Sequence, residues 1–116
     1  MPVPEVGSKP VIEILTFSGC PNRERALALV SEILAEAGAE ADVRRVDVPD
    51  PETATRTRFL GSPTIRVNGR DIEPGADERR QFVLSCRVFR TDGGLTGEPD
   101  PRWLHDALLQ APRGAS

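Results

Sequence analysis

Short apolar runs and amphipathic segments alternate through the first half of the chain. Residues 11–17 (VIEILTF) form a nearly continuous apolar run of strand length, which is typical of a strand buried on both faces of a sheet. Over residues 21–37, apolar side chains recur at three- and four-residue steps and predict an amphipathic helix. Pro21 suits its first position and Gly38 the position after its end. A second strand is expected at residues 43–48.

A cap, a turn and an alternating strand follow in the middle of the chain. Asp50–Pro51 is an N-cap followed by a first-turn proline, and it predicts a short helix that runs to about Leu60 and stops at Gly61. Residues 62–67 alternate as a strand does. Asn68–Gly69 is a strong two-residue hairpin signal, so we expect the chain to return as a strand over residues 70–73.

The pattern is less regular in the last third. We expect a short helix within residues 76–85, a strand over residues 86–90 because its side chains alternate, and a loop over residues 91–98. Asp100–Pro101 predicts the start of a final helix that carries Trp103 and several apolar residues. Strands that alternate with helices indicate the α/β (α+β) class, with at least one parallel pair in the sheet.

Length and composition describe one small domain. The chain has 116 residues, 38% hydrophobic and 28% charged, with a net charge of −3. We assign residues 11–111 to the domain, residues 1–10 to a flexible leader and residues 112–116 to a frayed tail. The sequence has no stripe of clustered Lys and Arg, so we expect no nucleic-acid partner. No signal peptide or membrane-spanning run is recognisable, so we expect no membrane partner and a cytoplasmic location.

Cys20 is the residue most suited to chemistry. It lies where the first strand turns into the first helix, so helix N–H groups and the positive end of the helix dipole favour its thiolate. Arg23 adds a positive charge one turn along, and we expect the pKa of Cys20 to fall below the usual thiol value. The alternative is a small buried hydrophobic residue. The carboxylates, Asp71 among them, form no obvious pair in the sequence.

The segment from Phe17 to Arg23 (FSGCPNR), followed later by Gly61-Ser62-Pro63-Thr64 before a strand, resembles the thioredoxin and glutaredoxin superfamily. The resemblance covers residues 11–73 and implies a thioredoxin-like mixed sheet of four to five strands flanked by three helices. It implies that Cys20 is the nucleophile and Pro63 a cis-proline whose neighbourhood pairs with substrate. On this basis the substrate-binding candidates are Pro21, Arg23, Ser62, Pro63 and Thr64. No cofactor is expected.

Arg23 occupies the position at which the superfamily's two-thiol motif has its second cysteine, so this chain is a single-cysteine CPxR variant. The only other thiol is Cys86. The stretch from Leu84 to Phe89 is similar to the surroundings of the second catalytic cysteine of organomercurial (alkylmercury) lyases, in which two distant cysteines converge on a thioredoxin-like core. That lyase uses an aspartate where this chain has Arg23, which cannot donate a proton at neutral pH. The alternative for Cys86 is a buried strand residue.

Three functions therefore stay open, and the sequence leaves the enzyme status undecided. The first is thiol–disulfide exchange through Cys20 on a protein or small-thiol substrate, with Cys86 or an external thiol as the resolving partner. The second is an organomercurial or soft-metal handler in which Cys20 and Cys86 bind mercury compounds or another soft ion, since two thiolates prefer such ions but do not make a structural zinc site. The third is a non-enzymatic module that binds a partner protein.

Overall fold

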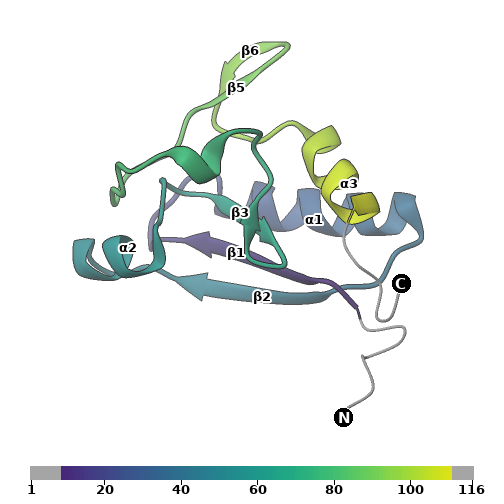
Figure 1. Ribbon diagram of the computed structural model, residues 1–116, viewed down its shortest axis with the longest axis horizontal. Helices are drawn as coiled ribbons and strands as arrows, with labels where there is room; N and C mark the ends of the chain where they lie inside the picture. Colours follow the sequence, from purple (N-terminus) through teal and green to yellow (C-terminus); the bar gives the residue numbers. More distant parts are fainter. Residues whose placement is uncertain (1–8, 111–116) are drawn as a thin grey trace.

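A four-stranded sheet is the centre of the computed structural model, which describes residues 9–110 (Figure 1). Its strands lie in the order β2–β1–β3–β4. β1 is parallel to β2 and antiparallel to β3, while β3 and β4 form the hairpin predicted at Asn68–Gly69. The bounds are β1 (Val11–Thr16), β2 (Asp42–Asp47), β3 (Thr64–Val67) and β4 (Arg70–Asp71). This mixed sheet confirms the α/β class.

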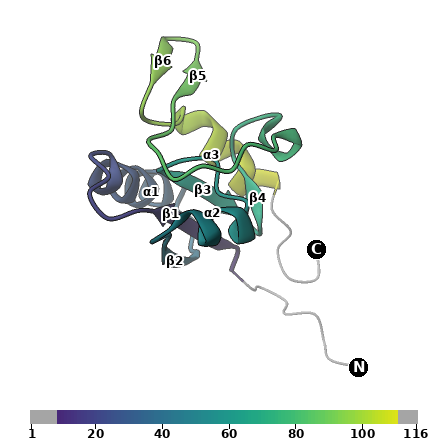
Figure 2. The ribbon, with the colours of Figure 1, turned by 90° about the vertical axis from the view of Figure 1, so that its left-hand side faces the viewer.

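Within the described residues, three α-helices accompany the sheet, the number that the resemblance implies. A single 3-10 turn and a two-stranded hairpin complete the chain, and both views show this hairpin projecting from the rest of the molecule (Figures 1 and 2). The helices are α1 (Arg23–Ala37), α2 (Pro51–Thr57) and α3 (Pro101–Gln110), the turn is η1 (Ala76–Glu78), and the hairpin is β5 (Phe89–Thr91) with β6 (Gly94–Thr96). The expected leader and frayed tail lie outside the described residues, apart from residues 9 and 10.

Both faces of β1 are buried, as the apolar run predicts. Ile12 and Ile14 belong to one apolar cluster with buried residues of α1 and α3, whereas Leu15 belongs to a second cluster with Phe59 of the segment after α2. Neighbouring side chains of a strand point to opposite faces, so α1 and α3 share one face of the sheet and the second cluster lies on the other. The central strand is thereby fixed from both sides.

The first helix starts later than the sequence predicts. Its N-cap is Asn22 rather than Cys20, and Pro21 lies in a turn before it. The Cys20 N–H donates to the Phe17 carbonyl, and the Arg23 N–H donates to the Cys20 carbonyl. The Cys20 carbonyl is thus used in a three-residue turn rather than in the i→i+4 bond of an α-helix. Gly38 ends the helix in the left-handed conformation, as predicted.

The predictions for residues 76–98 are largely wrong. Instead of a helix within residues 76–85, only η1 forms, because the backbone beyond it bonds elsewhere: the Val83 N–H donates to the Phe59 carbonyl. The strand expected over residues 86–90 begins only at Phe89. The expected loop at residues 91–98 is instead a β-hairpin closed by the Thr91–Gly94 pairing.

No helix within residues 9–110 is both long enough and apolar enough to cross a bilayer.

Candidate functional site

Cys20 lies in the connection between β1 and α1. The residue is only 8% exposed, yet it belongs to neither of the two apolar clusters. Its neighbours Pro21 and Arg23 are exposed, and Arg23 is the first residue of α1. The thiol expected to be the nucleophile is therefore largely covered, while the two adjacent candidates face outward.

The turn before β3 and the Cys20 loop lie at the same end of the central strands β1 and β3. Leu15, near the end of β1, pairs with Thr64, the first residue of β3, so the segments that follow β1 and precede β3 leave the sheet together. The Ser62–Pro63 peptide bond is cis, as the resemblance implies. Ser62, Pro63 and Thr64 are all buried, which leaves their side chains no open surface for a substrate.

The segment of Cys86 crosses this turn. Ser62 and Cys86 form an isolated parallel β-bridge. The Ser62 N–H donates to the Ser85 carbonyl at 2.8 Å, and the Arg87 N–H donates to the Ser62 carbonyl at 2.9 Å. Both backbone groups of the residue before the cis-proline are thus bound by the chain itself. Cys86 is exposed and lies outside β1–β6, so the alternative of a buried strand residue is wrong.

Gly61 permits this crossing. Its φ is +119°, a conformation that side-chain-bearing residues rarely adopt. A Cβ atom at this position would lie 2.9 Å from the Arg87 Cβ and 3.2 Å from the Ser85 carbonyl oxygen. The close approach of residues 85–87 therefore requires glycine here.

A largely buried group of charged and polar side chains anchors the same segment, and we call it the Arg87 cluster: Arg87, Asp71, Glu73, Arg79 and Thr64. The Arg87 guanidinium donates to Asp71 at 2.7 Å and to Glu73 at 2.7 Å, with side-chain exposures of 2%, 5% and 8% for the three residues. It also donates to the Thr64 hydroxyl at 3.1 Å. Glu73 accepts a further bond from the half-exposed Arg79. The carboxylates of Asp71 and Glu73 therefore balance the two guanidinium groups.

Sequence reasoning missed this cluster. Asp71 looked like an isolated turn carboxylate, and the structure instead joins it with Glu73 around one cation. The available signal was their two-residue spacing, because residues two apart on an extended segment share a face. Arg87 lies sixteen residues beyond Asp71 with no periodic relation to it, so only the fold brings the partners together.

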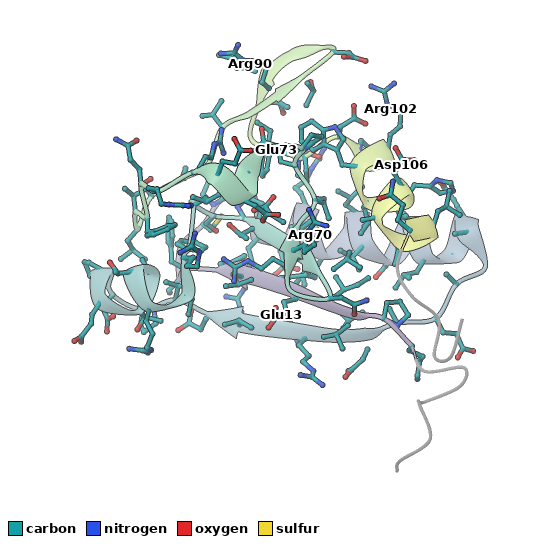
Figure 3. All side chains as sticks on the ribbon, viewed as in Figure 1. Glu13, Arg70, Glu73, Arg90, Arg102 and Asp106 are labelled. Carbon is teal, nitrogen blue, oxygen red and sulfur yellow. The ribbon has the colours of Figure 1, made fainter. Side chains whose placement is uncertain are left out.

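Cys86 opens onto a pocket of about 310 Å³ beside the Arg87 cluster. Three arginines and three apolar side chains line it together with the thiol; the lining residues are Leu60, Arg79, Arg80, Gln81, Val83, Ser85, Cys86, Arg87 and Val88. A larger pocket of about 450 Å³ lies between β4 and α3, with Arg70 and Asp106 in its lining and neither cysteine (Figure 3). Only the first of these two pockets is linked to thiol chemistry.

The segment 96–98 covers the start of α1, next to Cys20. Arg25 of α1 forms a 2.8 Å ion pair with Glu98, and Gly97 packs so closely on the Asn22 side chain that a Cβ would overlap it. The hairpin β5–β6 and its return are tied to α3 as well, since Arg102 binds Asp92 at 2.6 Å. Figure 3 shows Arg102 on the side of α3 that faces the hairpin.

Both ends of α2 are fixed by side chains, which holds the Gly61 turn that follows. Asp50 accepts the Thr53 N–H at 2.7 Å, and this bond keeps the pKa of Asp50 below its usual value. Arg66 of β3 donates to the Thr57 carbonyl at 2.7 Å, and burial lowers the pKa of Arg66. A guanidinium remains charged despite such a shift, so it keeps capping the helix.

The described residues contain no group of three or more His, Cys, Asp or Glu side chains placed to hold a metal ion. Compared with known proteins, the chain matches no protein-family model and no curated sequence.

Proposed function

We propose that this chain is a thioredoxin-like thiol–disulfide exchange protein in which Cys20 and Cys86 act as a pair. The observation that carries the proposal is that Cys86 bridges to Ser62, while β1, the strand that leads to Cys20, pairs with β3 directly after this turn. One segment follows the strand that pairs with the start of β3, and the other bonds to both backbone groups of Ser62. Arg23 replaces the local second thiol of the superfamily motif, so the partner thiol must come from elsewhere.

The chain itself supplies the pairing that the resemblance gives to a substrate. In the superfamily, the backbone beside the cis-proline pairs with a thiol-bearing segment held near the nucleophile. In this protein Ser85–Arg87 occupies that backbone, with Cys86 at its centre. We therefore interpret Cys86 as a resident thiol partner of Cys20.

The reaction that follows from such a pair is a two-electron exchange. The two thiols become one Cys20–Cys86 disulfide, and a substrate disulfide RS–SR is reduced to two RSH molecules, which take up the two protons released. A mixed disulfide between one cysteine and RS is the intermediate. The reverse direction oxidises a pair of substrate thiols.

Mild oxidation tests the pair directly. After treatment with diamide, we expect the monomer to lose two hydrogens in mass and a peptide joining Cys20 to Cys86 to appear in a non-reducing digest. Cys20→Ala and Cys86→Ser serve as matched controls, each of which removes that peptide. Oxidation that yields only intermolecular dimers or reagent adducts, in a protein with native circular dichroism, overturns the proposal.

The same two thiols support a second candidate, the binding of a soft metal ion such as Hg(II). Arg23 is exposed at the start of α1, where the lyase resemblance requires a proton-donating aspartate, so binding is favoured over carbon–mercury cleavage. We expect one Hg(II) per chain, lost in either cysteine variant, and no benzene from phenylmercury. Release of benzene overturns the binding-only interpretation.

If both cysteine variants retain full mercury binding and exchange activity, both thiol functions are overturned and only the partner-binding module survives.

A further inference from the structure

We infer that Cys86, rather than Cys20, is the thiol that meets the substrate, and that its pocket takes one half of a small anionic disulfide. This inference rests on the proposed pair and adds the order of the steps and the substrate class. It reverses the order that the superfamily resemblance implies.

Exposure decides the order. Cys86 is exposed, whereas Cys20 is only 8% exposed. Attack on a disulfide requires the sulfur of the attacking thiolate to approach in line with the S–S bond, which a covered thiol cannot do on an external molecule. Cys20 can instead attack an adduct formed on its neighbour within the same chain.

The charge of the pocket decides the substrate class. Its lining contains three arginines and no carboxylate. Arg79 and Arg87 are balanced by Asp71 and Glu73 behind them. Arg80 is exposed and donates only to the backbone carbonyls of Asp77 and Arg79, so its charge has no carboxylate partner among residues 9–110.

Two further features fit a bound molecule rather than bulk solvent. Leu60, Val83 and Val88 give the pocket an apolar side, and Val83 and Val88 are 43% and 56% exposed. A volume of about 310 Å³ lies at the small end of ligand pockets, which suits half of a small disulfide.

Two thiolate displacements complete the exchange. The Cys86 thiolate attacks RS–SR, the S–S bond breaks, a Cys86–S–S–R mixed disulfide forms and RS⁻ leaves. The Cys20 thiolate then attacks the Cys86 sulfur, the Cys20–Cys86 disulfide forms and the second RS⁻ leaves. The anionic part of R is held beside Arg80 in the first step.

A charge series of three disulfides tests the inference on the Cys20→Ala variant, in which Cys86 is the only thiol. The probes are glutathione disulfide (anionic), hydroxyethyl disulfide (neutral) and cystamine (cationic). Each rate of adduct formation, read by mass, is divided by the rate for the same variant unfolded in urea. We expect glutathione disulfide to be favoured over cystamine about fivefold or more, and the preference to shrink in high salt.

Arg80→Gln is the specific variant, and Arg45→Gln on the opposite edge strand β2 is its matched control, since both remove one exposed positive charge. Arg80→Gln should lower the relative rate with glutathione disulfide about two- to fivefold, as expected for one exposed charge, and Arg45→Gln should leave it unchanged. Equal effects of both variants, or no charge preference, overturn the anionic pocket.

The wild-type chain tests the order and covers a failure of Cys20→Ala to fold. Quenched early in the reaction, it should carry the glutathione adduct on Cys86; an adduct on Cys20 overturns the inference. A selective Cys86 adduct that never proceeds to the Cys20–Cys86 disulfide contradicts the proposed pair while supporting the anionic pocket. If diamide forms the Cys20–Cys86 disulfide but the adduct rates show no charge selectivity, the proposed pair is supported and the anionic pocket is overturned.

Discussion

Two regions hold the same sheet by different forces. The face covered by α1 and α3 is an apolar cluster that includes Ile12, Ile14 and the fully buried Leu104. The β4 edge is held by the Arg87 cluster, in which one buried guanidinium bonds to two buried carboxylates. The apolar face fixes the helices on the sheet, while the charged edge fixes a loop that carries a thiol.

The two regions differ in how well they tolerate the substitution of a side chain. An apolar contact is non-directional, so neighbouring side chains can partly fill a gap left by a substitution. A buried ion pair depends on its geometry, and loss of one partner leaves the other charge buried without compensation. The charged edge should therefore be the more fragile region per side chain, and it is the one next to Cys86.

The largest effect is expected at Arg87. Arg87→Met keeps much of the side-chain volume but removes the ion-pair partner of Asp71 and leaves Glu73 with Arg79 alone, so we expect a loss of about 3–5 kcal/mol in the free energy of unfolding by urea denaturation. Cys86 should also react faster with neutral reagents, because its segment is released. Arg79→Gln is the control: this side chain is 46% exposed, and its loss should cost about 1 kcal/mol or less. Equal losses in the two variants contradict the assigned role of Arg87.

The next effect is expected on the apolar face. Leu104→Ala removes a fully buried side chain from the cluster between α3 and the sheet, which should cost about 2–5 kcal/mol in the same measurement. The reactivity of Cys86 with neutral reagents should stay at the wild-type value in the folded state, since Leu104 lies in a different cluster. Leu109→Ala, at a site 66% exposed on the same helix, should be nearly neutral. Faster Cys86 labelling in Leu104→Ala shows that the two regions are not separable.

A smaller, differential effect is expected at two glycines. Gly61 and Gly69 both have positive φ, but only Gly61 has neighbours that a Cβ would overlap. Gly61→Ala should therefore be less stable than Gly69→Ala by about 1–3 kcal/mol, the usual cost of overpacking. It should also weaken the contact of residues 85–87 with Ser62, which hydrogen exchange at the Arg87 N–H measures. Equal stability of both variants excludes close packing at Gly61.

The local elements were predicted where local physics decides them. The apolar run of β1, the Asp50 cap of α2 and the Asn68–Gly69 turn each depend on a few neighbouring residues, and all appear where expected. The stretch from residue 76 to residue 98 was mispredicted because its backbone and side chains bond to distant residues such as Phe59, Ser62 and Glu73. In this stretch the local preference of the residues for a helix or a strand is too weak to compete with those long-range bonds.

The sequence by itself determined the two thiols, the arginine at the position of the motif's second cysteine, and the α/β class, because these follow from residue type and short-range periodicity. Only the tertiary structure decided that Cys86 is exposed, that Cys20 is covered, and that Asp71, Glu73 and Arg87 meet. Exposure and ion pairing depend on which distant segments pack together. That packing is set by the register of β1 with β3 and by the bridge at Ser62, neither of which leaves a periodic signal in the chain.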